Sequence, residues 1–135
     1  MSYERAIVDG LYMFSQSPEH IRYTISDFNR YLVYPVLHDK CRIFYEDEKP
    51  IGLVTWAWLT NEEVDAFLST KWALDETTYQ RDTGDQLWGM DFIAPFGHAR
   101  LVMRRMRQIS KDLYGDTKCH WRRLHNPLER HIRRF

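Results

Sequence analysis

The sequence predicts an α/β (α+β) fold in which helices flank one central mixed β-sheet, within a single domain that spans residues 1–135. Three observations predict it. Segments with the helical period alternate with segments rich in β-branched and aromatic residues. Hydrophobic residues make up 44% and aromatic residues 15% of the chain, which is typical of a packed core. The chain also has a common domain length, and we find no internal repeat or linker.

Two helices are expected before the first strand. Residues 3–15 place Ile7, Leu11 and Phe14 at helical spacing. Ser17 is a suitable N-cap and Pro18 is suited to a first helical position, which predicts a second helix from Pro18 towards Leu32. Pro35 should end or bend that helix. The apolar face of the second helix would consist of Ile21, Ile25, Phe28 and Leu32.

A hairpin and a third strand should form the middle of the sheet. The pattern predicts strands at 41–45 and 51–59, joined by a turn at residues 46–50. The second of these strands is apolar on both faces and should therefore be central. Thr60 or Asn61 should cap a short helix that ends near Leu68. The polar residues 75–85 read as a loop, and residues 86–93 as the third strand.

The clearest helix is expected at residues 98–113, after a turn at Pro95 and Gly97. Its apolar stripe would consist of Val102, Met106, Ile109 and Leu113. Four cations repeat with the same period on the opposite, exposed face, namely Arg100, Arg104, Arg107 and Lys111. Gly115 is a plausible C-cap, residues 117–124 a last strand, and residues 126–135 a short basic helix or tail.

Charge is divided unevenly along the chain. Residues 1–97 carry 8 basic and 16 acidic residues, whereas residues 98–135 carry 11 basic and 3 acidic residues. This asymmetry indicates that the C-terminal third meets something acidic, either nucleic acid, an acidic carrier protein or the rest of the same chain. No apolar run approaches the length of a membrane span, and the N-terminus lacks the order of a signal peptide. We therefore expect a cytoplasmic protein, in which Cys41 and Cys119 are reduced.

Asp91 is the first candidate for chemistry, because it is an acid inside an apolar strand. Burying an unpaired carboxylate is costly. Strand alternation would put Trp88, Met90 and Phe92 on one face and Asp91 on the other with Gly89, where a glycine leaves room for a ligand. The spacing alone also allows a structural acid that pairs with an arginine.

His20 is the second candidate. If Ser17 is the N-cap, His20 lies in the first helical turn, where the helix dipole disfavours imidazolium. A neutral histidine beside a carboxylate is suited to act as a general base. The alternative is a histidine that only solvates the start of its helix.

Other sites are less well supported. The remaining histidines show no metal-ligand spacing, so no metal site is expected. Nucleophile-elbow and nucleotide-loop motifs do not occur. The turn "APFGHA" precedes a helix whose free N–H groups could hold a phosphate, but a glycine-rich phosphate loop is missing. That disfavours free acyl-CoA as a donor and leaves room for a phosphopantetheine arm.

Three segments resemble one known family. "SPEH" (17–20), "PIGLVTWAWL" (50–59) and "TGDQLWGMDFIAPFG" (83–97) occur in the order and at the separations found in toxin-activating lysine acyltransferases of the HlyC type, which activate RTX toxins. The resemblance spans residues 10–112. It implies a fold of the GCN5-related N-acetyltransferase type. It also implies transfer of a fatty acyl group from acyl carrier protein to lysine ε-amino groups of a protein substrate, with His20 and Asp91 as the catalytic residues.

A mechanism follows as a hypothesis. His20 takes a proton from the lysine amine while Asp91 orients His20, or else His20 itself accepts the acyl group first. The acyl-phosphopantetheine of acyl carrier protein would be the co-substrate, with no bound cofactor. Backbone N–H groups near Ala94, Phe96 and Gly97 would meet the oxyanion. The basic helix face, with Arg100, Arg104 and Arg107, would dock the acidic carrier.

Partners and competing functions stay open at this point. The protein substrate could resemble an RTX toxin, and the sequence leaves a homodimer open. One alternative is an acyl-CoA-dependent acetyltransferase, which the missing glycine-rich loop disfavours. Another is a non-catalytic binding protein that has repurposed the fold. Nucleic acid is a poorly supported ligand, because few aromatic side chains accompany the C-terminal charges.

Overall fold

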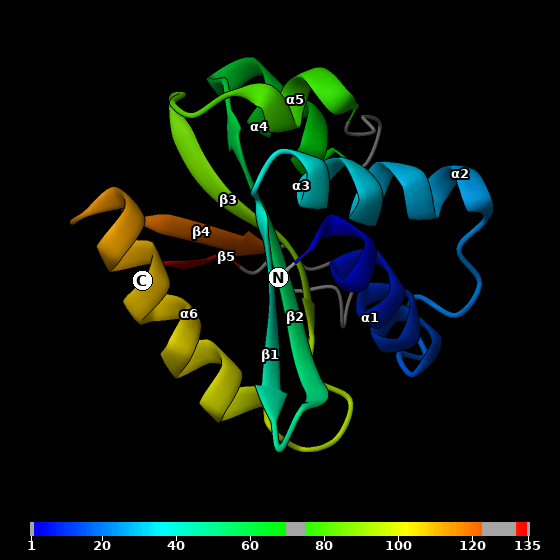
Figure 1. Ribbon diagram of the computed structural model, residues 1–135. Helices are drawn as coiled ribbons and strands as arrows, with labels where there is room; N and C mark the ends of the chain where they lie inside the picture. Colours follow the sequence, from blue (N-terminus) through cyan, green and yellow to red (C-terminus); the bar gives the residue numbers. More distant parts are fainter. Residues whose placement is uncertain (1, 70–74, 123–131, 135) are drawn as a thin grey trace.

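The computed structural model describes residues 2–69, 75–122 and 132–134, and it has a mixed β-sheet between layers of helices (Figure 1). The sheet has five strands in the order β1-β2-β3-β4-β5. Neighbouring strands are antiparallel except β3 and β4, which are parallel. The predicted fold class is therefore confirmed. The strands are β1 (Cys41–Glu46), β2 (Lys49–Leu59), β3 (Gln86–Ile93), β4 (Cys119–Arg122) and β5 (Ile132–Arg134).

Strand β2 is the buried centre of the fold, as its apolar pattern predicts. Every residue from Ile51 to Leu59 is buried, because helices cover both faces of the strand. Strand β2 begins at Lys49, two residues earlier than expected, since the hairpin turn contains only Asp47 and Glu48. Both have positive φ angles, of 50° and 66°, which match the twist of a two-residue hairpin.

Helix α1 (Tyr3–Ser15) lies on one face of the sheet and confirms the first predicted helix. Its buried residues are Gly10, Met13 and Phe14. Gly10 allows close packing here, because a Cβ atom would lie 2.6 Å from Leu32 Cδ1 and the Leu32 side chain would have to shift. Leu11 is 52% exposed, so the expected apolar face was wrong at that residue.

The second predicted helix was wrong at both ends. It begins at Ile25, as α2 (Ile25–Phe28), and continues through the π-helical segment η1 (Asn29–Val33) into α3 (Tyr34–Leu37). Thr24 caps it, exchanging hydrogen bonds with Asp27 in a capping box, so residues 18–22 form turns instead. Pro35 does not end the helix. Pro35 has no N–H to donate, but it directly follows the π-helical segment η1. The wider turn of η1 does not require an i→i−4 hydrogen bond from residue 35.

The exposure of two isoleucines follows from this shift. Ile21 lies in the turn and is 63% exposed, and Ile25 lies in the first helical turn and is 89% exposed. The predicted apolar face therefore fails for both residues. Leu32 is fully buried, as expected, and packs with Met13 and Phe14 in the core cluster that joins α1 to the sheet.

Two short helices cover one end of the sheet. Helix α4 (Asn61–Leu68) has Thr60, one of the two expected caps, as its N-cap. Glu63 completes a capping box with Thr60. Helix α5 (Glu76–Gln80) stands where the sequence suggested a loop. Asp75 caps α5, and Tyr79 is fully buried in a cluster with Ala57 and Trp88, so a buried aromatic anchors this polar segment.

Helix α6 (Ala99–Tyr114) covers the opposite face from α1 and α3 (Figure 1). Val102 and Met106 are buried against β2, whereas Leu113 at the end of the predicted stripe is 47% exposed. Gly115 ends the helix with a positive φ angle of 61°, as predicted. None of the helices in the described part of the chain combines the length and apolar character that crossing a bilayer requires.

The C-terminal segment differs from expectation. Residues 132–134 form strand β5, which pairs with β4, and not a helix or tail. The rest of the expected helix, residues 126–131 and 135, lies outside the described residues. Cys41 and Cys119 are free thiols, and burial raises the pKa of each to about 12.

Candidate active site

His20 reaches the interior from a turn and not from a helix. Its backbone N–H and that of Ile21 both donate to the Ser17 carbonyl oxygen, each at 3.0 Å, in the turn that follows α1. The expected position in a first helical turn was therefore wrong, and with it the helix-dipole argument for a neutral ring. The turn still buries the side chain, because His20 is only 4% exposed.

Asp91 owes its orientation to a β-bulge. Thr55 of β2 pairs with Asp91, and the next residue, Trp56, pairs with Gly89, so Met90 is the extra residue on β3. After the extra residue Met90, each side chain of β3 points to the face of the sheet opposite to the one that strict alternation predicts. Gly89 lies against the Trp121 ring, where a Cβ would come within 2.2 Å of a ring carbon. Asp91 instead faces the side covered by α1, so the expectation that Asp91 and Gly89 share a face was wrong.

The two candidate residues are in direct contact although 71 positions separate them. His20 Nε2 lies 2.8 Å from Asp91 Oδ1, and the two side chains are 3% and 6% exposed. The backbone N–H of Asp91 donates to Thr55 Oγ1 at 3.1 Å, which fixes the strand at this residue. This pairing agrees with the expectation that Asp91 orients His20, and the pair lies in the core.

Ser17 completes the arrangement. Its Oγ lies 2.7 Å from His20 Nδ1, and the residue is only 6% exposed. The Asp91 carboxylate can only accept a hydrogen bond in its ionised form, so a neutral His20 ring donates Nε2–H to it and accepts the Ser17 hydroxyl at Nδ1. This order of groups (hydroxyl, imidazole and carboxylate) can pass a proton from the hydroxyl side to the ring.

Sequence reasoning did not assign Ser17 to the site. The Ser17 hydroxyl was expected only as a helix cap, whereas it is hydrogen-bonded to the His20 ring. The three-residue spacing of Ser17 and His20 was available as a signal. In a turn closed by a hydrogen bond between the same two residues, that spacing brings the side chains together.

Aromatic rings enclose the histidine. The rings of Phe14 and Tyr23 each lie 5.0 Å from the His20 ring, measured between centroids. Burial and, secondarily, the charge of Asp91 raise the pKa of Tyr23 far above its usual value. The same two causes raise the pKa of Tyr79. Both phenols therefore stay protonated, and the carboxylate lies in surroundings of low polarity, where its hydrogen bond to His20 is strengthened.

The other predicted site residues lie farther along the chain from this contact. Ala94, Phe96 and Gly97 form the turn between β3 and α6. Phe96 is 44% exposed and its ring lies 6.3 Å from that of Tyr12 on α1. Gly97 has a φ angle of +89°, and a Cβ there would meet nothing within 4 Å, so the backbone of this turn is open.

The basic face of α6 is exposed as predicted. Arg100, Arg104, Arg107 and Lys111 all have exposed side chains. In the described part of the chain, no group of three or more His, Cys, Asp or Glu side chains could hold a metal ion. The contacts of His20 with Ser17 and Asp91 allow proton transfer at its ring, whereas the exposed cations of α6 lie over the other face of the sheet (Figure 1).

The structure thus holds a buried histidine–carboxylate contact on a mixed α/β sheet, and sequence comparison gives the family. The sequence model of the RTX toxin acyltransferase family matches residues 6–134. The chain therefore belongs to this family, which confirms the resemblance seen in the three motifs.

Individual relatives are consistent with that assignment. The RTX-II toxin-activating lysine-acyltransferase ApxIIC of Actinobacillus pleuropneumoniae is 28% identical over 72% of this chain and 59% of its own length. The lysine-acyltransferase RtxC of Vibrio cholerae is 32% identical over 76% of this chain and 67% of its own length. The protein-lysine myristoyltransferase RtxC of Kingella kingae is 26% identical over 75% of this chain and 59% of its own length. The chain matches between half and two thirds of the length of most of these relatives.

Proposed function

We propose that this chain is a protein-lysine acyltransferase, which moves a fatty acyl group from acyl carrier protein to the ε-amino group of lysine on a protein substrate. The observation that carries the proposal is the buried contact of His20 with Asp91 in a member of the RTX toxin acyltransferase family. The names of three relatives, as lysine acyltransferases or a lysine myristoyltransferase, support the reaction and the acceptor.

The chemical problem in this reaction is the acceptor. A lysine amine is mostly protonated at neutral pH and must lose a proton before its nitrogen can attack a thioester. That first proton passes to solvent. The attack of the neutral amine then forms a C–N bond and breaks the C–S bond, and the proton that the nitrogen sheds as the amide forms passes to His20. The departing thiolate then takes that proton. Base catalysis of this kind contributes about 10²–10⁴-fold.

Geometry supports His20 as the base over His20 as the acyl acceptor. Nδ1 and Nε2 are both occupied, by Ser17 and Asp91. Acylation of either nitrogen would require one of these hydrogen bonds to break. A proton, in contrast, can enter through the Ser17 hydroxyl without moving the ring. In this mechanism Asp91 fixes the tautomer and stabilises the imidazolium.

The donor proposal rests on charge. Acyl carrier proteins are acidic, and the exposed cations of α6 offer a complementary surface. The phosphopantetheine arm would run past the open turn at Ala94, Phe96 and Gly97, where backbone N–H groups are candidates to bind the oxyanion. Since acyl carrier protein is cytoplasmic, the reaction is proposed to occur there, on a target that could resemble an RTX toxin.

Intact-mass analysis tests the reaction. Proteins encoded beside this gene would be co-expressed with the wild-type chain, with His20→Ala and with Glu19→Ala. Glu19 is the matched control, because it lies in the same turn with its side chain exposed. A lysine-linked acyl mass shift in the wild type and in Glu19→Ala, absent in His20→Ala, is expected. Equal shifts in all three would contradict the assigned base.

Charge reversal tests the donor. Arg104→Glu should raise the KM for acyl carrier protein at low salt and leave kcat unchanged, since docking on exposed charges is screened by salt. Lys49→Glu, an exposed change on the β1–β2 hairpin, serves as the control. Turnover of acyl-CoA should not respond to Arg104→Glu. An unchanged KM for the carrier at low salt would remove the docking surface.

A further inference from the structure

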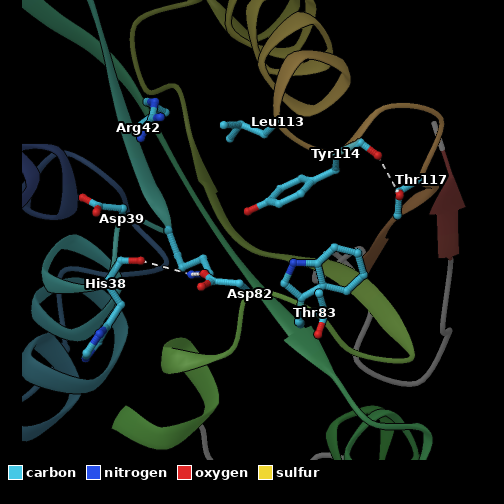
Figure 2. Close-up of a pocket in the computed structure, with 10 residues that line it drawn as sticks. His38, Asp39, Arg42, Asp82, Thr83, Leu113, Tyr114 and Thr117 are labelled. Carbon is cyan, nitrogen blue, oxygen red and sulfur yellow. Dashed lines mark hydrogen bonds and ion pairs between the residues drawn. The ribbon is translucent and has the colours of Figure 1, made fainter.

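A pocket lies on the sheet face covered by α6, and neither His20 nor Asp91 lines it. It is a pocket of about 620 Å³, within the range of small-molecule sites. Figure 2 shows Asp39 and Arg42 on one side, Leu113 and Tyr114 of α6 on the other, and Asp82 with Thr83 between them. The proposed acyl transfer uses none of these residues.

The pocket contains a buried cation with a poorly anchored partner. Lys40 is only 3% exposed, and its ammonium donates to the His38 carbonyl oxygen at 3.1 Å and to Asp82 Oδ1 at 3.0 Å. The side chain of Asp82 is 91% exposed, so this carboxylate is held by little else. The third N–H of the ammonium has no acceptor among the described residues.

An indole N–H in the same pocket also lacks an acceptor. Trp58 is 8% exposed, and its Nε1 is a buried donor with no hydrogen-bond partner in the described part of the chain. Trp56, two residues earlier on β2, shows the satisfied case, because its Nε1 donates to Tyr114 Oη at 2.8 Å. Buried donors are nearly always paired in folded proteins, which indicates that something else meets the Trp58 N–H.

The charges select the ligand. Lys40 and Arg42 contribute two positive charges, and Asp39 and Asp82 two negative ones. Asp39 is tied to the Tyr3 hydroxyl at 3.3 Å, and His38 is paired with Glu76. If the exposed Asp82 side chain swings out, one net positive charge is left, which matches a monoanion and disfavours a dianionic phosphate.

We propose that this pocket binds a small monocarboxylate, which replaces Asp82 at the Lys40 ammonium and accepts the N–H of Trp58. A carboxylate suits these donors, since its two oxygens can accept several hydrogen bonds. The apolar part of the ligand lies against Leu113 and the Tyr114 ring. The Tyr114 and Trp58 rings pack edge-to-face, with their centroids 5.3 Å apart. This ligand is distinct from the acyl donor and the lysine acceptor.

Nitrogen-detected indole resonances of the full chain test the site. Benzoate should shift one indole N–H signal saturably, and Trp58→Phe should remove that signal and weaken binding. Asp82→Asn removes the competing carboxylate and should tighten benzoate binding by about two- to fivefold, the worth of an exposed ion pair. Asp65→Asn, which removes an exposed charge on α4, should leave the affinity unchanged.

Three further probes decide the chemistry. Benzamide, the neutral isostere, and inorganic phosphate should both bind more weakly than benzoate. Octanoate and acetyl-leucine separate a fatty acid from a peptide C-terminus as the source of the carboxylate. The proposal is overturned if benzoate shifts no indole signal, if benzamide or phosphate binds as tightly as benzoate, or if Asp82→Asn behaves like Asp65→Asn.

Discussion

Two of the histidine–carboxylate pairs in the described part of the chain are alike in length and different in surroundings. His20 Nε2 lies 2.8 Å from Asp91, and His38 Nε2 lies 3.1 Å from Glu76. The side chains of the first pair are 3% and 6% exposed, whereas those of the second are 24% and 46% exposed. Distance alone therefore does not distinguish a candidate base from a surface contact.

Two features distinguish the pairs, namely the burial of His20 and Asp91 and the Ser17 hydroxyl beside His20. Water screens the His38–Glu76 contact, so it should contribute little to stability. Around His20, aromatic rings exclude water and the Ser17 hydroxyl occupies the second nitrogen. Of the two pairs, the buried one is the proposed base, and four predictions test that difference.

The largest expected effect is on the rate. Asp91→Asn should lower kcat for lysine acylation by about 10²–10⁴-fold, because the amide can hold the wrong tautomer and cannot stabilise the imidazolium. Glu76→Gln makes the same chemical change in the exposed pair and should leave kcat within about twofold. Steady-state rates with a lysine-bearing protein substrate provide the measurement. Equal losses in both variants would mean that the buried pair is not special.

The second effect is on stability. Asp91→Ala leaves the buried Nε2–H of His20 without an acceptor and should lower the free energy of unfolding by about 1–3 kcal/mol. Glu76→Ala, at the exposed pair, should change it by no more than about 0.5 kcal/mol. Urea unfolding monitored by tryptophan fluorescence compares them. If the two changes were equally costly, the burial argument would fail.

A smaller effect is expected at Ser17. Ser17→Ala removes one neutral hydrogen bond from Nδ1 and should lower kcat by about two- to tenfold. Ser17→Thr keeps the hydroxyl and should restore part of that loss. The pH dependence of kcat distinguishes a positioning role from a merely structural one, because the apparent pKa of the base should move in Ser17→Ala. If the pH profile of kcat in Ser17→Ala were the same as in the wild type, Ser17 would have a purely structural role.

The smallest effect is on a neighbouring phenol. Burial first, and then the Asp91 charge, raise the pKa of Tyr23. Asp91→Asn removes the second cause, so the Tyr23 pKa should fall but stay above its ordinary value. Ultraviolet titration at high pH, with Tyr23→Phe to assign the signal, measures this change. Glu76→Gln should have no influence, and a rise in the pKa would be inconsistent with the ionised state of Asp91.

The sequence indicated the two residues of the pair but not how the fold brings them together. The hairpin, β3 and α6 could be predicted, because apolar periodicity and helix ends are local signals. His20 was placed in a helix, since the Ser-Pro pair at 17–18 is a good helix start. The capping box at Thr24 and Asp27 competes with that start, and it holds the helix seven residues farther on.

The bulge at Met90 was beyond local reasoning. Strict alternation along β3 placed Asp91 on the face of Gly89, whereas the pairing with Thr55 and Trp56 shifts the register by one residue. That shift depends on packing between distant segments, including the Trp121 ring against Gly89. A single sequence carries no marker for such a contact. The hydroxyl partner of His20 was missed for a related reason, because a turn was read as a helix.

The separation of 71 residues between His20 and Asp91 ties the formation of the proposed base to the completion of folding. Contacts that close long loops form late, because their entropic cost is repaid only when much of the structure is in place. An emerging or partly folded chain can hold α1 and the β1–β2 hairpin and still have no base. The protein would thus acquire its activity in one step, as β3 docks beside β2, and would not modify lysines indiscriminately before then.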